Sequence, residues 1–355
     1  MRPTFAGTSR SSGQMIIMFA LVLTVVVTFV GLVVDGGYAL AQRRGSQNAA
    51  DFAALAGARI VAERIGGDAT NGTDANVQAA IQSVATANGG RPITFSAPDG
   101  PRYIASDGSL LGYVGTGAIP AEAVGVHVVS DRVWRPFFLG IIGAVDWTAS
   151  AEATAKGGFL AGPPPPSTLF PAGISTAFFE TYPYCSDSIS GTPGDPCYPV
   201  HLTPGNLNVP GGFGWLKFGC EGNGLGQGDD GGCDNNAPFL QSEIGPPSRS
   251  YGCCTQVGQD GPDRVGSLPG NKVSVDCSYY ISNHIIVTVP IWDTAGGTGS
   301  NAWYHIVGFA GFEITNCTGG KDLEGVWRKP FFLGPTSSTP ISPDVPQMLA
   351  VQLVK

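Results

Sequence analysis

The residues from Met15 to Val34 form an uninterrupted apolar stretch without a charged side chain. A helix of this length, at ~1.5 Å rise per residue, covers the ~30 Å apolar core of a bilayer. A cleaved secretory signal usually has a shorter apolar core of ~7–15 residues and ends in a small-residue cleavage site. Here the stretch is longer and continues into Asp-Gly-Gly-Tyr at residues 35–38. The sequence therefore predicts a retained membrane helix, with a cleaved signal peptide as the alternative.

Helix-forming residues continue beyond this stretch, from Tyr38 to Ile65. Glycines at positions 36, 37 and 45 weaken the helix locally and are candidate hinges. Small and aliphatic residues form a stripe along this part, which either packs on the chain's own domain or serves as a helix–helix assembly face. The stripe consists of Leu40, Ala49, Ala50, Ala53, Leu55, Ala56 and Ile60.

A fixed order of motifs surrounds the apolar stretch. Gly13-Gln14 precedes it, Val34-Asp35-Gly36-Gly37-Tyr38 closes it, and Gln42-Arg43-Arg44 and the Ala-rich run 47–58 follow. This order resembles the N-terminal region of TadE/TadG-like Flp pilus-assembly proteins, and strand-like and Phe-Phe-Leu segments extend the resemblance to about residues 13–156. The resemblance implies a single-pass protein of the bacterial cell envelope that acts with other pilus-assembly proteins of the tight-adherence secretion system.

The resemblance has one limit at the N-terminus. Pilins of related systems are cut after a glycine and carry Glu at the fifth mature position, whereas a cut after Gly13 would place Met18 there. We therefore expect an anchored assembly component rather than a fibre subunit. Asp35 is the expected polar stop at the membrane surface, and the residues to test for subunit contacts are Asp35, Gln42, Gln47, Asn48 and Asp51.

Composition separates the chain into two unlike halves. Glycine (52) and proline (28) are abundant in the 355 residues and only 13% are charged, which favours loops and strands over helical bundles. Residues 1–160 carry 11 acidic and 11 basic side chains, and residues 161–355 carry 16 and 8, so the net charge of −8 lies in the second half. Clustered Lys and Arg are needed to bind nucleic acid, so we expect no nucleic-acid partner.

All eight cysteines lie in the second half, and an even set in one Pro/Gly-rich region predicts disulfides formed in an oxidising compartment. Arg2 and Arg10 before the span are balanced by Arg43 and Arg44 after it, so the loop charges do not decide the orientation. The cysteines therefore favour a cytoplasmic N-terminus and extracytoplasmic C-terminal domains. The disulfide candidates are Cys185, Cys197, Cys220, Cys233, Cys253, Cys254, Cys277 and Cys317.

The pattern of elements predicts an α+β protein: a long N-terminal membrane helix with a small helix-on-sheet domain, followed by a disulfide-rich, mainly-β domain. Thr73 is a candidate N-cap for a short helix that ends at Asn88-Gly89-Gly90, and Val124, Val126 and Val128 share one face of a strand. The expected segments are a cytoplasmic tail (1–14), a transmembrane helix (15–34), a TadG-like α+β region (35–156), a Gly/Pro linker (157–167), a Cys-rich β domain (168–334) and a C-terminal tail (335–355).

An aromatic segment occurs twice. Val133-Trp134-Arg135-Pro136-Phe137-Phe138-Leu139-Gly140 returns as Val326–Gly334 with one inserted lysine. Either both copies are aromatic docking patches, with Arg available for cation–π contact, or both close the end of a sheet.

Signals for chemistry are weak. The four histidines, at positions 127, 201, 284 and 305, are isolated, and no nucleophile elbow, zinc-protease motif or phosphate loop is present. We therefore expect no enzyme activity, no cofactor and no small-molecule substrate; a hydrolase is the least favoured function. Asp229, Asp230 and Asp234 form a weak Ca²⁺ candidate on a Gly-rich loop. The alternative to a membrane-anchored structural role in pilus assembly is a surface adhesin or carbohydrate-binding protein that uses Trp215, Trp292 and Trp303.

Overall fold

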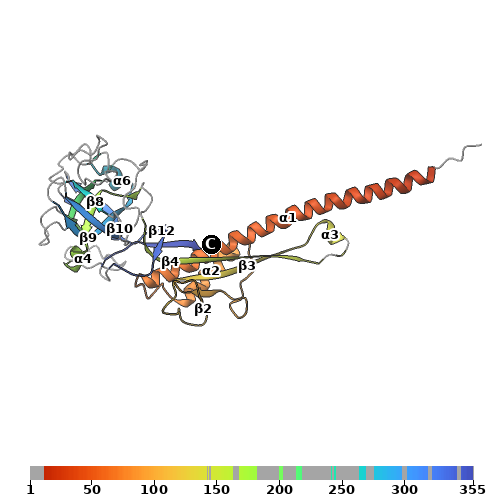
Figure 1. Ribbon diagram of the computed structural model, residues 1–355, viewed down its shortest axis with the longest axis horizontal. Coiled ribbons are helices and arrows are strands. Elements are labelled where there is room, and N and C mark those ends of the chain that lie inside the picture. Colours follow the sequence, from red (N-terminus) through yellow and green to blue (C-terminus); the bar gives the residue numbers. More distant parts are fainter. Residues whose placement is uncertain are drawn as a thin grey trace, which may run out of the picture.

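A long helix, α1, carries two sheet-based units at one end and is bare at the other (Figure 1). The structure is a computed structural model. It describes residues 12–141, 143, 145–162, 168–181, 200–202, 213–217, 241, 244, 264–268, 276–297, 302–318, 322–341 and 345–354.

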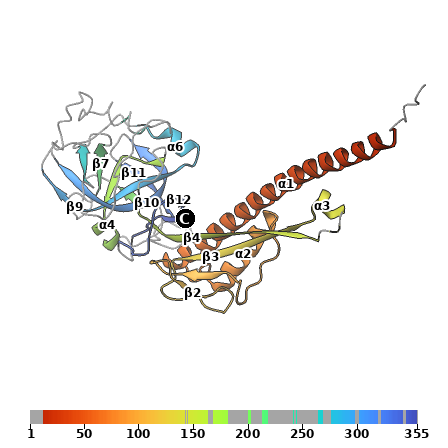
Figure 2. The same cartoon turned by 45° about the vertical axis from the view of Figure 1, so that its right-hand side comes forward.

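The helix α1 runs without interruption from Ser12 to Ile65, a length of 54 residues. Its apolar part, Met15–Val34, is exposed, and both views show it projecting away from the rest of the chain (Figures 1 and 2). A Cβ added at Gly36 or Gly37 would meet no atom within 4 Å, so neither glycine marks a close contact. The predicted continuation of the membrane helix is confirmed.

The second half of α1 packs on a sheet through small residues. The side chains of Ala50, Ala53 and Ala58 are fully buried in one cluster with residues of β3 (Gly125–Trp134) and β4 (Trp147–Leu160). Alanine lets the helix approach a sheet closely because no longer side chain holds the two backbones apart. Apart from the exposed Leu40, the predicted stripe therefore packs on the chain's own domain.

The short helix α2 (Asp74–Ala87) lies beside α1 and has the predicted ends. The hydroxyl of Thr73 accepts a hydrogen bond from the backbone N–H of Asn76, which satisfies one of the free N–H groups of the first turn. At the other end Gly89 has φ +75°, a left-handed conformation that suits glycine. Val77, Ile81 and Ala85 complete the core beneath α1.

A buried carboxylate ties α2 to the neighbouring strands. Asp74 accepts hydrogen bonds from the hydroxyl of Tyr103 (2.6 Å) and from the N–H groups of Gly115 (2.9 Å) and Gly117 (2.6 Å). Burial raises the pKa of Tyr103, and the bond to Asp74 adds to that shift. Tyr103 therefore stays neutral and keeps donating well above pH 7.

We expect Asp74→Asn to lower the free energy of unfolding by about 1–3 kcal/mol. The amide NH₂ group is itself a donor, so it leaves at least one of the donors that face Asp74 without an acceptor. Chemical denaturation of the purified full-length protein in detergent measures the loss. Tyr103→Phe, which removes only one of the three donors, is the matched control, with an expected cost of about 1 kcal/mol. A larger loss in the tyrosine variant than in the Asp74 variant would contradict this account.

The first sheet has the strand order β12-β14-β4-β3-β1-β2, and β13 pairs with β4. The β3–β4 pair is a long antiparallel hairpin with an unbroken register from Gly125↔Lys156 to Trp134↔Trp147. The remaining strands are β1 (Arg102–Ile104), β2 (Leu110–Tyr113), β12 (Phe331–Leu333), β13 (Thr336–Ser337) and β14 (Leu349–Val354).

In the second sheet, five strands close into a ring, since β10 pairs with β8 and β9, and β7 and β5 connect these two. The strand β10 is central in this sheet, because it also pairs with β11. The elements of this unit are β5 (Ala172–Ser175), β6 (Val200–Leu202), β7 (Phe213–Lys217), β8 (Arg264–Leu268), β9 (Ile286–Gly296), β10 (Trp303–Thr318), β11 (Asp322–Arg328), α4 (Thr176–Thr181) and α6 (Ser278–Ser282).

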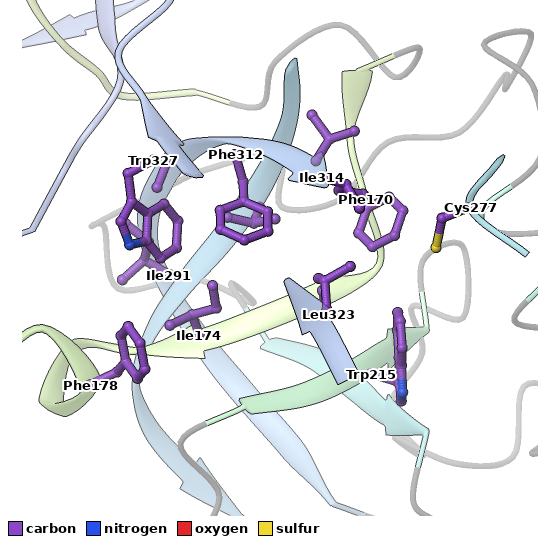
Figure 3. Packing of buried hydrophobic residues seen from close by; sticks show 14 of the residues in the cluster. Phe170, Ile174, Phe178, Trp215, Cys277, Ile291, Phe312, Ile314, Leu323 and Trp327 are labelled. Atoms are coloured by element: carbon purple, nitrogen blue, oxygen red, sulfur yellow. The ribbon is translucent and has the colours of Figure 1, made fainter. Parts of the chain in front are cut away.

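Aromatic side chains fill the core of the second unit. Trp327 of β11 lies 4.8 Å from Phe312 and 5.1 Å from Phe179, measured between ring centroids. Figure 3 shows Trp327 and Phe312 beside Ile291, and Phe178 below them. The predicted fold class, a helix-on-sheet unit followed by a mainly-β unit, is confirmed.

The boundaries between the two units differ from those of the expected segments. Residues 157–160, expected to begin a linker, are the last residues of β4. Residues 335–355, expected to be a tail, contain β13 and β14, and β14 pairs with β4 over six residues from Leu349↔Phe159 to Val354↔Thr154. The C-terminal strand thus completes the first sheet, and pairing in the sheet satisfies its backbone groups. Pro163–Pro166 lie outside the described residues.

One disulfide is described, between Cys277 before α6 and Cys317 of β10. It joins two segments that are 40 residues apart in the chain. The other six cysteines lie outside the described residues. The expectation of a disulfide in the C-terminal domain is confirmed for this pair.

Candidate membrane anchor and assembly surface

The exposed apolar part of α1 is the most distinctive surface of the chain. Within the described residues, α1 is the one helix long and apolar enough to cross a membrane, with a mean hydropathy of 3.0 over its most apolar window. Its large side chains point away from the protein along the whole stretch. Such a surface is costly in water and stable in lipid, so it suits a single-pass anchor.

Asp35, the expected polar stop, is buried where the tip of the β3–β4 hairpin meets α1. Its carboxylate accepts hydrogen bonds from the N–H groups of Phe137 (2.8 Å), Phe138 (3.1 Å) and Leu139 (2.9 Å), at the start of α3 (Phe138–Ile141). Burial would raise the pKa of Asp35, but the bonds from these three backbone groups outweigh it and hold the pKa below its usual value. Asp35 therefore fixes the hairpin tip to the helix.

The same contact contains four aromatic rings. Tyr38 of α1 lies 5.3 Å from Phe137 and 6.3 Å from Trp134, and Trp134 lies 6.3 Å from Trp147 across the hairpin. An open groove of about 600 Å³ runs between Leu40 of α1 and these two tryptophans. Sequence reasoning found the aromatic segment but not its place beside Tyr38, which is more than ninety residues away in the chain.

The remaining assembly candidates lie on the second half of α1. Asn48 is exposed, and Gln42 and Asp51 are half-buried. Gln47 is exposed, yet its amide donates to Asp51 (2.7 Å) and to the carbonyl of Glu152 in β4 (3.2 Å). Asn48 is thus the most accessible of the set for another protein, while Gln47 and Asp51 are already engaged within the chain.

One exposed residue of this face was missed. Phe52 is 52% exposed, although it lies within the Ala-rich run whose neighbours Ala53 and Ala54 are fully buried. It follows Asn48 by one helical turn, so both project from the face of α1 that the sheet does not cover. A single large aromatic within a run of alanines was the signal that could have identified it.

The other candidates do not converge on a site. Trp215 and Trp292 are buried, so they cannot form the exposed platform that a carbohydrate needs. Asp229, Asp230 and Asp234 lie outside the described residues. Among the residues that are described, no group of three His, Cys, Asp or Glu could hold a metal ion.

Three of the four histidines contact polar side chains of other segments, and the side chain of His201 lies outside the described residues. His305 lies 2.7 Å from Asp293 and His284 lies 3.3 Å from Glu313, measured from Nδ1 to a carboxylate oxygen. The Nδ1 of His127 lies 2.9 Å from the hydroxyl of Thr154 on the adjacent strand. The contacts of His127 and His305 join neighbouring strands, and His284 contacts β10 from the turn before β9, so the three histidines lie apart rather than in one catalytic set.

The two copies of the aromatic segment have different surroundings. The first forms the hairpin tip against α1, whereas the second joins the two units. In the second copy Trp327 is a core residue, Phe331 lies under the guanidinium of Arg59 at 4.7 Å, and Lys329 donates to the carbonyl of Gly66 (3.2 Å). The first copy of the segment therefore forms part of an exposed surface, and the second copy connects the two units.

Comparison with known proteins agrees with the anchor. No curated protein and no solved structure matches the chain. The resemblance of residues 60–156 to TadE/TadG-like proteins has no counterpart in these comparisons and stays a prediction. Residues 13–59, which comprise the exposed apolar part of α1 and most of the part that packs on the sheet, match the family described as putative Flp pilus-assembly TadE/G-like.

Proposed function

We propose that this chain is a membrane-anchored structural component of Flp/Tad pilus assembly that acts through protein contacts. The match of residues 13–59 to the TadE/G-like family carries this proposal. The anchor and the body share one helix, so a body built on α1 is held rigidly at the membrane surface. Such an arrangement suits a part that positions other proteins.

The orientation is part of the proposal: the N-terminus lies in the cytoplasm and both sheet units lie outside it. The disulfide between Cys277 and Cys317 supports this direction, because disulfides persist in oxidising compartments and are rare in the cytosol. Protease added to intact spheroplasts should then digest the two units and leave a short membrane-protected N-terminal fragment. Full protection of the sheet units in intact spheroplasts would reverse the orientation.

The contact surface that we propose is the outer face of α1 around Asn48 and Phe52. Both residues lie within the family match and point away from the sheet. Large aromatic side chains are enriched in the cores of protein interfaces, and Phe52 is such a side chain on an exposed face. The buried alanine face, by contrast, is occupied by β3 and β4.

Deletion of the gene in its own bacterium, followed by complementation, tests the function. We expect the deletion to abolish surface pili, full-length protein to restore them, and Phe52→Glu to reduce them at least tenfold at an unchanged protein level. Electron microscopy and immunoblots of sheared pilin give the count. Wild-type piliation of the deletion strain would refute the proposed function.

Leu110→Glu is the matched control. Leu110 lies in β2 of the same unit and is 47% exposed, close to the value for Phe52, but it lies outside the family match. We expect this variant to support normal piliation. Equal loss of pili in both variants would show that added charge on the surface, rather than the face around Phe52, is responsible.

A further inference from the structure

We propose that the tip of the β3–β4 hairpin is a second membrane-contacting element, which lies in the interfacial layer of the leaflet where α1 leaves the bilayer. The tip comprises residues 133–147. The inference depends on α1 being the membrane span, but it does not depend on a role in pilus assembly.

The depth of the tip follows from its contacts with α1. A Cβ added at Gly31 would lie 2.9 Å from the Cβ of Phe138, so the tip touches α1 at Gly31. Gly31 lies three residues before Val34, the end of the apolar stretch, which corresponds to ~4.5 Å along the helix axis. The tip is therefore held at the boundary between the hydrocarbon core and the headgroups, whose layer is a few Å thick on each side.

The outer part of the tip, residues 137–145, is apolar and is flanked by the exposed charged residues Arg135 and Asp146. Phe137 is 61% exposed and Val145 is 79% exposed, and residues 137–145 contain no charged side chain. This surface is continuous with the exposed apolar surface of α1, since Phe137 and Phe138 lie against Tyr38 and Gly31. The occupant that fits both surfaces is the bilayer that holds the helix.

The aromatic rings have the composition of a membrane interface. Tyr38, Trp134 and Trp147 lie at one level along α1, just beyond the apolar stretch. Trp and Tyr concentrate at the two membrane–water interfaces, where an apolar ring meets a polar edge. Arg135, which is exposed, precedes the charge-free run and can reach the headgroups.

Backbone satisfaction explains how a tip of this kind can enter the layer. A short helix such as α3 has free N–H groups at its start, and they are costly where water is scarce. Asp35 accepts from the N–H groups of Phe137, Phe138 and Leu139, so these donors need no water. A buried carboxylate from α1 thus prepares the tip for a weakly polar environment.

Quenching by brominated lipid tests the proposal on the full-length chain in vesicles of phosphatidylcholine and phosphatidylglycerol. The chain has six tryptophans, and two of them, Trp134 and Trp147, lie in the tip. If the six emit equally, we expect bromine near the carbonyl region of the lipid to lower the emission by up to a third, two of six. Trp134→Phe combined with Trp147→Phe should abolish the quenching.

A second variant separates insertion from folding. Phe137→Glu combined with Val145→Glu places charge on exposed positions, so we expect at least a twofold loss of quenching with unchanged circular dichroism and unchanged flotation with the vesicles. Leu110→Glu, exposed elsewhere, should leave the quenching at the wild-type level. Absent quenching in wild-type protein that floats with the vesicles, or equal quenching in the charged variant, would overturn the proposal. A second protein copy covering the tip would give the first of these results.

Discussion

Replacement of Gly157 by alanine is expected to destabilise the first unit by about 3 kcal/mol or more, because the added methyl group has no space. The Cβ of residue 157 would lie 2.1 Å from the carbonyl oxygen of Ala58 and 3.0 Å from the Cβ of Ala62. The oxygen belongs to the backbone of α1, where it accepts a hydrogen bond of the helix. It cannot turn aside as a flexible side chain would, so α1 and β4 must separate.

Separation of α1 from β4 would affect the whole alanine core. The buried alanines of α1 have short side chains, so they contact the sheet only when the two backbones are close. The dispersion attraction between helix and sheet falls steeply when the two surfaces move apart. Hydrogen exchange of the amides of residues 49–62 in detergent measures this effect directly. We expect them to lose protection in the Gly157→Ala variant, whereas the amides of β9 and β10 in the second unit keep theirs.

Gly112→Ala is the matched control. Gly112 lies in β2 of the same sheet, and a Cβ there would meet no atom closer than Pro120 Cγ at 3.9 Å. Alanine at a compatible position restricts the unfolded chain, so we expect a change within about 1 kcal/mol, in the stabilising direction. Native protection of α1 in the Gly157→Ala protein would show that the helix does not pack on β4 as described.

Gly157 also illustrates where sequence reasoning fails. A Gly-Gly pair before four prolines predicts a linker, in which the glycines bend freely and the prolines form a stiff spacer. In the structure Gly157 faces α1 and Gly158 faces Ser337, so both glycines allow backbone to approach β4 from its two sides. Ala58 lies 99 positions from Gly157 and Ser337 lies 179 positions from Gly158, and a single sequence does not reveal such contacts.

Features that depend on neighbouring residues were predicted well. The long helix, the N-cap at Thr73 and the buried valines of β3 all follow from periodicity and capping, which are local properties. The strand β14 was missed because its pairing with β4 joins residues about 200 positions apart. The site follows the same rule: Asp35 was found from its position after the span, but its partners in the hairpin were not.

Removal of the bond between Cys277 and Cys317 is expected to lower the free energy of unfolding of the second unit by about 4 kcal/mol, from the entropy of a closed loop of this length. The two residues are 40 positions apart, so the reduced unfolded chain gains much freedom. The variant replaces both by alanine. Four of the six tryptophans, at positions 215, 292, 303 and 327, lie in this unit, so denaturation followed by their fluorescence reports on it.

The same measurement in the presence of a reductant is the control for the covalent bond. The chain contains six further cysteines besides this pair. Reduction affects every bridge, so the quantity to compare is the difference between wild-type and variant protein under each condition. We expect the difference to fall from about 4 kcal/mol when oxidised to within about 1 kcal/mol when reduced, where only the lost sulfur atoms at buried Cys277 and half-buried Cys317 remain as a cost. An equal difference in both conditions would mean that packing of the two side chains, rather than the covalent bond, stabilises the contact between α6 and β10.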